Sequence, residues 1–520
     1  MAERVAVGDA PATEEGLTFE SAAGRWVLAV AVLGSGMAFL DGTVVNVALP
    51  DIGRDLGAST SSLQWILNGY LLTLASLILL GGSLGDRHGR RRIFVFGVSL
   101  FTVASLLCAV APNAELLVAA RLLQGVGGAL LTPGSLAMIE ASFRPTDRAR
   151  AIGAWSGLGG VAAAIGPLLG GYLVEAVSWR AIFLINIPLG LLVVTMASRH
   201  VPETRDPTAS GGLDFGGAAL AALGLAGTTY TLIEAPDKGV SGSVLVAGIG
   251  GIIALIAFLF AERRGANPMM PLEIFSSRQF SAANLVTFVV YAALGGVFFL
   301  LVAFLQVSLG YSPIEAGAAS LPVTVLMLLL SARSGALAQR IGARIPLSVG
   351  PVVIAAGLLL MTGIDPGDSY VSSVLPAVIV FGLGLTLVVA PVTATVLAAA
   401  DARHSGIASG INNAVSRVAG LLAVAVLPLI AGLTGDRFYD AAAMTDGFRV
   451  AMVACAALAV TGGILAWLTI SSDVLAAEPE PEGDTPERIA SDYACAVAGA
   501  PLRPGREAEC HPIPGEEQAA

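Results

Sequence analysis

The chain has 520 residues, of which 55% are hydrophobic and only 13% charged, with a formal net charge of -10 at pH 7. Soluble proteins carry about 25% charged residues, so this composition excludes a water-soluble globular fold and predicts a chain that lies mostly in a membrane. The single lysine, Lys238, is followed by glycine, so no G-x-x-x-x-G-K-[ST] phosphate loop is present. The four cysteines have no metal-ligand spacing, and we expect no metal site.

Hydrophobic runs long enough to cross a bilayer recur along the chain. A hydrocarbon core about 30 Å thick requires roughly 20 residues of helix. The runs begin near Trp26, Ser62, Ile93, Ala114, Ala149, Ala181, Phe215, Ser243, Ser281, Ala316, Ile345, Ser372, Gly406 and Phe448. We therefore predict an all-α polytopic membrane protein with about fourteen transmembrane helices.

Basic residues are divided unevenly between alternate loops. One set of loops holds fifteen basic residues and the other set holds five. An excess of arginine and lysine in short loops marks the cytoplasmic side of a membrane protein. We therefore expect a multi-pass protein of the cell membrane with both termini in the cytoplasm.

One short motif occurs twice. The sequence GSLGDRHGR at residues 82–90 returns in a weaker form as GALAQRIGAR at residues 335–344, each time after the second helix of its half. This repeat indicates two parallel six-helix bundles with an extra helix pair between them. The expected organisation is a cytoplasmic tail (1–25), an N-terminal bundle (26–200), a linker with two extra helices (201–279), a C-terminal bundle (280–472) and a disordered acidic cytoplasmic tail (473–520).

Two ionisable residues lie deep in the predicted spans, where a charge is costly and therefore indicates function. At 1.5 Å per residue, Asp41 lies roughly 22 Å above the cytoplasmic edge and Arg121 roughly 10 Å below the outer edge, so the two could pair. A carboxylate that can lose its charge to a proton, or keep it beside a cation, has the property that proton coupling requires. The alternative is a permanent ion pair that only braces two helices.

Other polar residues in the spans are candidates for lining a cavity. Arg417 is a third deep charge with no obvious acidic partner; it could bind an anionic group or backbone carbonyls, or have a structural role. Gln124 shares a helix face with Arg121. For the aromatic and amide residues of the second helix, packing is the alternative to cavity lining. The full set of cavity candidates is Asn46, Trp65, Asn68, Tyr70, Gln124, Asn412, Asn413 and Arg417.

The loop after the second helix contains an acid among arginines. Positive charge alone would suffice as a topology signal, but Asp86 stands beside Arg87 and near Arg90, between two glycines that permit a tight turn. This arrangement suggests a charge latch between helix ends that could break and remake.

The fifth predicted helix carries a stripe of small residues. Ala162, Gly166 and Gly170 recur at four-residue spacing, and Pro167 removes one backbone hydrogen bond. Close helix contact and a bend or pivot are expected there, with ordinary packing as the alternative.

Several of these motifs together resemble the major facilitator superfamily, in particular its fourteen-span drug/proton antiporters of the multidrug efflux type. The similar segments are LDGTVVNVALP at 40–50, the loop at 82–91, Leu117 with Arg121, Gln124 and Gly125, then Gly166-Pro167 with Gly170-Gly171, and the stretch 179–190. The resemblance implies two bundles that rock around a central cavity, proton coupling by Asp41 and Arg121, and gating by the loop from Asp86 to Arg90. Gln339 departs from it, because an acid is usual there.

The sequence therefore predicts a transporter and not an enzyme: a proton-coupled secondary exporter of small hydrophobic or cationic drugs or natural products, working by alternating access and conferring antibiotic resistance. A facilitator or importer of a polar metabolite in the same fold is an alternative. An intramembrane enzyme is a more distant one, since the spans lack a paired nucleophile and base. We expect protons as the coupling ion with no other cofactor, the lipid bilayer and a lipophilic substrate as partners, no nucleic acid, and a monomer.

Overall fold

The computed structural model describes residues 16–206, 212–265, 267–400 and 405–475. Within these ranges fourteen helical segments are long and apolar enough to cross a membrane, which confirms the predicted number. Thirteen begin within four residues of the predicted start, but the last begins at Ala441 rather than near Phe448. The reason is a cap: the Asp440 side chain accepts a hydrogen bond from the Ala443 amide and starts the helix before its hydrophobic run. The predicted tails 1–25 and 473–520 lie largely outside the described residues.

The first eight spans run from residue 22 to residue 264. They are α1 (Ala22–Leu56), α2 (Thr60–His88), α3 (Arg90–Ala109), α4 (Ala114–Ser142), α5 (Pro145–Ala176), a sixth span made of α6 (Ala181–Leu184) and α7 (Asn186–His200), and then α8 (Phe215–Lys238) and α9 (Gly242–Arg264). The sixth span is interrupted at Ile185, so Asn186 stands at the start of α7.

The last six spans follow a 3-10 turn, η1 (Leu272–Ser276). They are α10 (Arg278–Val307), a tenth span made of α11 (Pro313–Ala319) and α12 (Leu321–Ile341), α13 (Arg344–Met361), η2 (Tyr370–Val374) continuing into α14 (Leu375–Ala398), α15 (Ser405–Ile430) and α16 (Ala441–Thr469). The short turns η4 (Gly435–Tyr439) and η5 (Ser472–Leu475) flank α16. The break between α11 and α12 lies just before Pro322.

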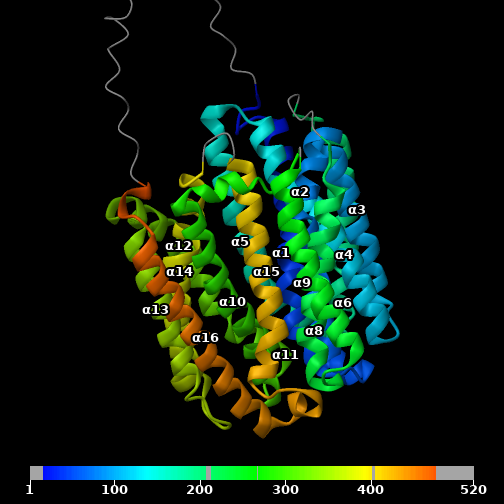
Figure 1. Cartoon of the computed structure of the whole chain (residues 1–520), viewed down its shortest axis with the longest axis vertical. Coiled ribbons are helices and arrows are strands. Elements are labelled where there is room, and N and C mark those ends of the chain that lie inside the picture. Colours follow the sequence, from blue (N-terminus) through cyan, green and yellow to red (C-terminus); the bar gives the residue numbers. More distant parts are fainter. Residues whose placement is uncertain (1–15, 207–211, 266, 401–404, 476–520) are drawn as a thin grey trace, which may run out of the picture. The chain divides into compact units, whose positions relative to one another are not determined.

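The helices of the two halves stand side by side. In Figure 1, α10, α12, α13, α14 and α16 lie on the left and α2, α3, α4 and α6 on the right, with α15 near the centre. We call the membrane side where α1 starts the terminal side, and the side where α1 ends the far side. The inserted helix α8 packs against both α2 and α15, whereas α9 packs mainly against α8.

The two copies of the repeated motif have similar backbone conformations. Gly89, after α2, has φ +109°, and Gly342, after α12, has φ +85°. Residues with a β-carbon rarely adopt these values, so glycine is required at both turns. The two loops therefore turn in the same way although their sequences match only weakly.

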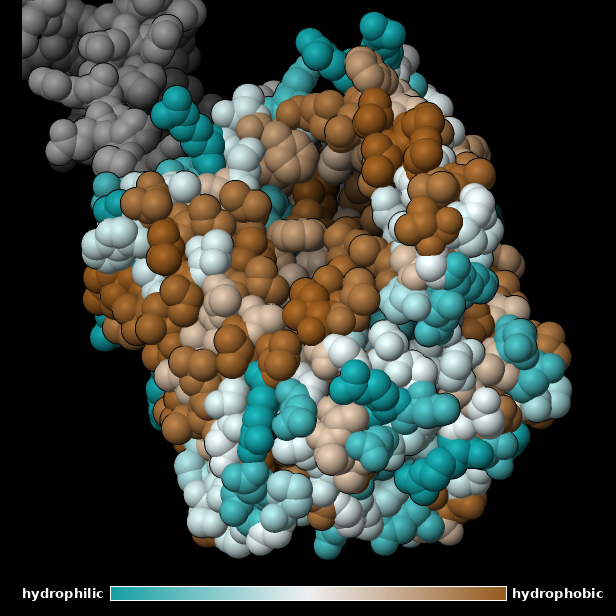
Figure 2. All heavy atoms as spheres, turned by 60° about the horizontal axis from the view of Figure 1, so that its bottom comes forward, coloured by the Kyte–Doolittle hydropathy of each residue, from teal (hydrophilic) through white to brown (hydrophobic). Residues whose placement is uncertain are grey.

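The two halves touch through several hydrogen bonds at the far side. The Gln64 amide donates to the Val424 carbonyl over 2.7 Å, Gln306 donates to Val47 over 2.8 Å, and the Tyr439 hydroxyl donates to Ala58 over 2.9 Å. We call these three contacts the far-side seal. In Figure 2 the polar far side faces the lower part of the view, and above it a hydrophobic flank is hollowed near its upper middle.

Candidate functional site

The two deep charges of the first half meet inside the structure. Nη1 of Arg121, on α4, lies 2.5 Å from Oδ2 of Asp41, on α1, and the side chains are only 1% and 0% exposed. Asp41 and Arg121, which the sequence places at similar depths, therefore form an ion pair. A buried ion pair is costly to assemble and still more costly to break by losing one partner.

Arg121 is surrounded by further partners. Its Nε donates to the Ile66 carbonyl over 3.0 Å, and Nη1 also donates to Gln124 Oε1 over 2.6 Å. The Tyr70 ring lies 4.5 Å below the guanidinium carbon, a cation–π distance. Two of the predicted cavity candidates, Tyr70 and Gln124, thus contact the ion pair itself.

The second oxygen of Asp41 is held by amides. Gln124 Nε2 donates to Oδ1 over 2.8 Å, and Asn186 Nδ2 donates to the same oxygen over 3.4 Å. Both amides also donate to the Ser105 hydroxyl, over 2.9 Å and 3.3 Å. Ser105 and Asn186 were not among the predicted site residues. Asn186 lies in the stretch 179–190 that resembles the family, whereas the signal for Ser105 was a polar residue within an apolar run. We call Asp41, Arg121, Gln124, Ser105 and Asn186 the α1–α4 cluster.

This cluster can store or release a proton only with a structural change. A proton on Asp41 cancels its charge and leaves Arg121 buried without a counter-charge, which is unfavourable where the dielectric is low. Protonation therefore favours a conformation in which Arg121 reaches water or another acceptor.

The α1–α4 cluster is mechanically close to the contact between the halves. On α1, Thr43 donates to the Ala163 carbonyl of α5 over 3.3 Å, and Val47 accepts the Gln306 bond of the far-side seal. Both residues lie within two turns of Asp41 on the same rigid helix. A shift of α1 at Asp41 therefore moves both contacts.

Glycines bring α5 against its neighbours. A β-carbon at Gly166 would clash with Thr43 of α1, and one at Gly170 would lie 2.5 Å from Val44. At Gly171 it would clash with the Pro313 carbonyl of α11, and the reciprocal Gly317 of α11 faces the Pro167 carbonyl. The predicted small-residue stripe thus joins α5 to α1 of its own half, and Gly171, next to the stripe, joins it to α11 of the second half. α5 remains one helix through Pro167.

Two of the residues predicted to form a latch, Asp86 and Arg90, make an ion pair within one half, at the terminal side. Asp86 Oδ1 lies 2.8 Å from Arg90 Nη2, and their side chains are 37% and 17% exposed. Arg87 lines a cavity of about 240 Å³ together with Asp86 and Asp214, next to the loops that flank the inserted helices. Glu203 lies 3.6 Å from both Arg91 and Arg92. The latch therefore ties α2 to α3, and the loop after α7 covers it.

The remaining cavity candidates are scattered over the structure and do not share one cavity wall. Trp65 points to the inserted pair, where its indole donates to Glu234 of α8 over 2.9 Å. Asn46 donates to the Gly42 carbonyl of its own helix, and Asn68 is buried with neither amide atom paired among the described residues. Asn412 donates to Asn284 and Thr287 of α10 over 3.2 Å and 3.0 Å. Asn413 and Arg417 lie together on α15, with 3.4 Å between Oδ1 and Nε.

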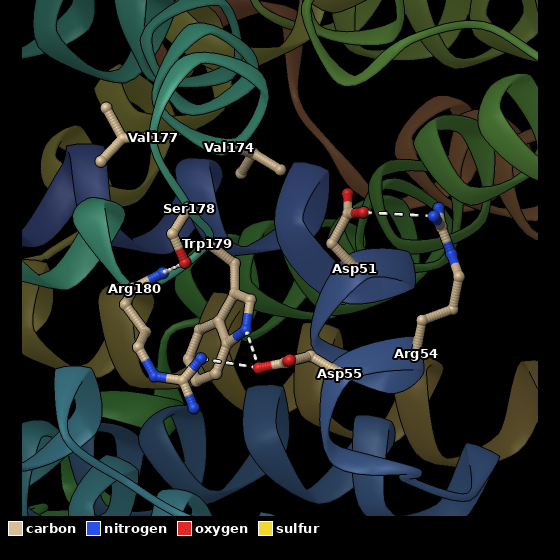
Figure 3. A pocket seen from close by; sticks show the side chains of 8 residues that line it. All are labelled: Asp51, Arg54, Asp55, Val174, Val177, Ser178, Trp179 and Arg180. Atoms are coloured by element: carbon tan, nitrogen blue, oxygen red, sulfur yellow. Dashed lines mark hydrogen bonds and ion pairs between the residues drawn. The ribbon is translucent and has the colours of Figure 1, made fainter.

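A separate polar pocket lies at the far side. It has a volume of about 420 Å³ and is lined by residues of α1 and of the segment after α5, including Asp51, Asp55 and Arg180. Figure 3 shows Trp179 and Arg180 both directed at the Asp55 carboxylate, at 2.8 Å and 2.6 Å. These bonds tie the end of α1 to the start of the sixth span.

Comparison with known proteins places this arrangement in a family. The family model described as Major Facilitator Superfamily matches residues 31–424. A methylenomycin A resistance protein of Bacillus subtilis (strain 168) is 36% identical over 87% of this chain and 96% of its own length. The tetracenomycin C resistance and export protein of Streptomyces glaucescens is 37% identical over 80% of this chain and 77% of its own.

The fold agrees with solved transporters. A bacterial homologue of the human lysosomal transporter Spinster, in an inward-facing and unoccupied conformation, superposes with a TM-score of 0.65 at 18% identity, covering 88% of this chain and 98% of its own. Fourteen spanning helices and a family match over most of the chain agree with one another. The chain belongs to the Major Facilitator Superfamily, and it is a multi-pass membrane transporter rather than an enzyme.

Proposed function

We propose that the protein exports small lipophilic drugs or natural products in exchange for protons. The observation that carries the proposal is the buried Asp41–Arg121 pair, joined by Gln124 and Asn186 and placed on the helix that also contacts α5 and α10. The relatives are named for resistance to methylenomycin A and for resistance to and export of tetracenomycin C, which supports drugs as the substrate class.

In the proposed cycle, the proton and the far-side seal are linked through α1. Binding of the drug from the terminal side shifts α1 against α4 and weakens the bond between Gln306 and Val47, so the halves separate at the far side and meet at the terminal side, as alternating access requires. At the far side a proton binds Asp41 and releases Arg121 as the drug leaves. The protonated form closes the far side again, and loss of the proton at the terminal side restores the Asp41–Arg121 pair.

We further propose that the terminal side faces the cytoplasm of the cell. Arginines at the helix ends on that side, including Arg87, Arg91 and Arg92, support this orientation, because basic residues are retained inside. Protons then enter from the far side and drugs leave toward it. The protein is expected to act as a monomer without any cofactor besides the proton.

Everted membrane vesicles with an acid interior test the proposal directly. Addition of tetracenomycin C or methylenomycin A is expected to collapse part of the preformed pH gradient when the wild-type protein is present. Asp41→Asn should abolish this response, whereas Asp446→Asn, near the start of α16 and distant in sequence from the cluster, is the matched control and should keep it.

The same vesicles separate the alternatives. If labelled drug moves down its gradient with no pH change, the protein is a facilitator. If Asp41→Asn exchanges drug for protons as the wild type does, the coupling role assigned to Asp41 is wrong.

A further inference from the structure

Arg417 is a charge in the middle of the membrane that the proposed proton site does not use. It stands halfway along the 26 residues of α15 and is half-buried. A cation at this depth is costly unless it has a partner or a ligand. The groups around Arg417 therefore decide whether the protein itself or a ligand balances its charge.

The neighbours of α15 define the face on which Arg417 lies. Gly410 meets Leu79 of α2, and Leu421 packs with Leu72 of the same helix. On another side, Asn412 bonds α10 and Gly420 lies against Gly295 of α10. At 100° per residue, Arg417 falls between these two faces. It is thus directed into the seam between the first half and the second.

Two tyrosines come from helices that pack against α15. Tyr70 of α2 and Tyr291 of α10 both lie within electrostatic range of the Arg417 guanidinium. Tyr70 also contacts Arg121. One aromatic side chain from each half is therefore in the neighbourhood of Arg417.

The guanidinium has few partners within the protein. Its Nε donates to Asn413 Oδ1 over 3.4 Å, and among the described residues no acceptor lies within hydrogen-bond distance of either Nη atom. Of the helices that pack against α15, α10 and α14 contain no acid, and the acids of α2 and α8 that lie nearest, Asp86 and Glu234, are paired with Arg90 and with Trp65 and Lys238. The acid nearest to the centre, Asp41, is already bound to Arg121 and Gln124.

We propose that Arg417 binds the anionic group of the substrate, so that the preferred substrates are lipophilic monoanions such as aromatic carboxylates or sulfonates. The two free Nη atoms match the two oxygens of such a group, and the tyrosine rings contact its apolar body. This assignment rests on the proposed export function and narrows its substrate class. A cationic substrate, in contrast, finds no free carboxylate at this level among the described residues.

The charge of the substrate has an energetic consequence. When one proton enters and one monoanion leaves, two elementary charges cross in the same electrical direction, whereas exchange of a proton for a neutral compound moves one. Because each charge responds separately to the membrane potential, an inside-negative potential drives monoanion export about twice as strongly. If Arg417 selects monoanions, the membrane potential contributes more to the driving force of export than it does for a neutral compound.

Binding of matched ligand pairs tests the assignment. The probes are naphthalene-2-sulfonate, tetracenomycin C, and a panel of aromatic sulfonates with the corresponding neutral sulfonamides, measured by ligand-induced change in Tm on the full chain in uncharged detergent. Sulfonates are expected to bind roughly 10- to 100-fold more tightly than their sulfonamides, the range for a hydrogen bond to a charged group. Arg417→Gln should reduce that ratio to near one, and Arg417→Lys should restore part of it.

A second arginine of the same half serves as the matched control. Arg333 of α12 is exposed and lies about 12 Å from the helix end at Ile341. Arg333→Gln should keep the wild-type ratio. The same binding measurement with added anionic phospholipid shows whether the ligand of Arg417 is a lipid headgroup or a soluble anion. A lipid that binds Arg417 would compete with the sulfonates and weaken their binding.

The outcomes distinguish this inference from the proposed function. If the wild type binds sulfonates no better than sulfonamides, or binds no panel member, or if Arg417→Gln leaves the ratio unchanged, the inference is overturned. If the inference is overturned in one of these ways but tetracenomycin C is still exchanged for protons in an Asp41-dependent manner, the export function still holds. Loss of proton exchange with the ratio intact overturns the export function alone.

Discussion

Arg121 and Arg417 both lie within membrane-spanning helices, and their surroundings are opposite in kind. Arg121 in the first half has an ion pair, two carbonyl acceptors and an aromatic ring, and it is 1% exposed. Arg417 in the second half has one long bond to Asn413 and stays half-buried. The partners of Arg121 are all supplied by the protein, and its ion pair is lost when Asp41 binds a proton. Arg417 has donor atoms without an acceptor, and a ligand can bind them. The comparison separates the proposed coupling site from the proposed substrate site.

The largest expected effect comes from removing each arginine in turn. Arg121→Leu leaves Asp41 buried without a counter-charge and should destabilise the protein by about 3–5 kcal/mol. Arg417→Leu removes a charge without a carboxylate partner and should leave the stability nearly unchanged or raise it. Thermal unfolding in detergent measures both. Equal losses for the two variants would contradict the difference between the sites.

A companion double variant checks that the cost arises from the orphaned charge. Asp41→Asn combined with Arg121→Gln replaces the ion pair by two neutral amides. It should recover a large part of the stability that Arg121→Leu loses, because no uncompensated charge remains. Failure to recover would point to packing instead of charge.

Removing an amide beside either arginine should lower the stability less than removing Arg121. Asn186→Leu removes one donor to Asp41 and one to Ser105, and we expect a loss of about 1–3 kcal/mol, the cost of unsatisfied buried polar groups. Asn413→Leu removes only the long bond to Arg417 and should cost less than 1 kcal/mol. Both Tm values can be measured beside those of the arginine variants. A larger loss for Asn413→Leu would reverse the comparison.

Much of the first site could be predicted from the sequence, because it depends on depth. Asp41 and Arg121 fall at similar heights when residues are counted along their helices, and a buried charge needs a partner. The roles of Ser105 and Asn186 could not be predicted in this way, since a hydroxyl or amide in an apolar run gives no sign of which face it occupies. Asn186 also depends on the break between α6 and α7, a tertiary feature.

The second half was harder to interpret from sequence. The absence of an acid near Arg417 was visible, but the face it occupies follows from contacts of α15 with α2 and α10, which no local pattern encodes. Trp65 illustrates the same limit: its aromatic ring and indole were compatible with a cavity, and the structure places it against Glu234 of the inserted helix α8. Long-range helix pairing decides such cases.

An internal partner for Arg417 should have a moderate effect on anion binding. Asn413→Asp places a carboxylate one turn from Arg417 and so imitates the internal pair of the first half. The aspartate should occupy the guanidinium and lower the preference for anions by about 2- to 5-fold, consistent with roughly 0.5–1 kcal/mol for a partly exposed pair. The sulfonate-to-sulfonamide affinity ratio is the measurement, and Asn412→Asp is the control. An increased ratio would contradict an open Arg417.

The smallest effect is expected at the two repeated loops. Asp86 is partly exposed, so Asp86→Asn should change the stability by only about 0–1 kcal/mol. Because the acid is present in the first loop and replaced by Gln339 in the second, Gln339→Asp should add a comparable small interaction with Arg340 or Arg344 in the second half. Tm measurements on single and double variants test this. A loss of several kcal/mol from Asp86→Asn would show that the latch is more than a surface pair.

The inserted helix pair makes the two seams of the molecule unequal. On one seam, α2 meets α15, and Leu225 of α8 packs with Leu72 and Leu421 across both. On the opposite seam, α5 meets α11 and α12 directly, and in the described part of the chain no further helix packs extensively against both. The α2–α15 seam is thus covered by a third helix, whereas the opposite seam is closed only by the direct contact of α5 with α11 and α12. A lipophilic compound in the bilayer therefore meets the inserted pair on one flank and the two bundles themselves on the other.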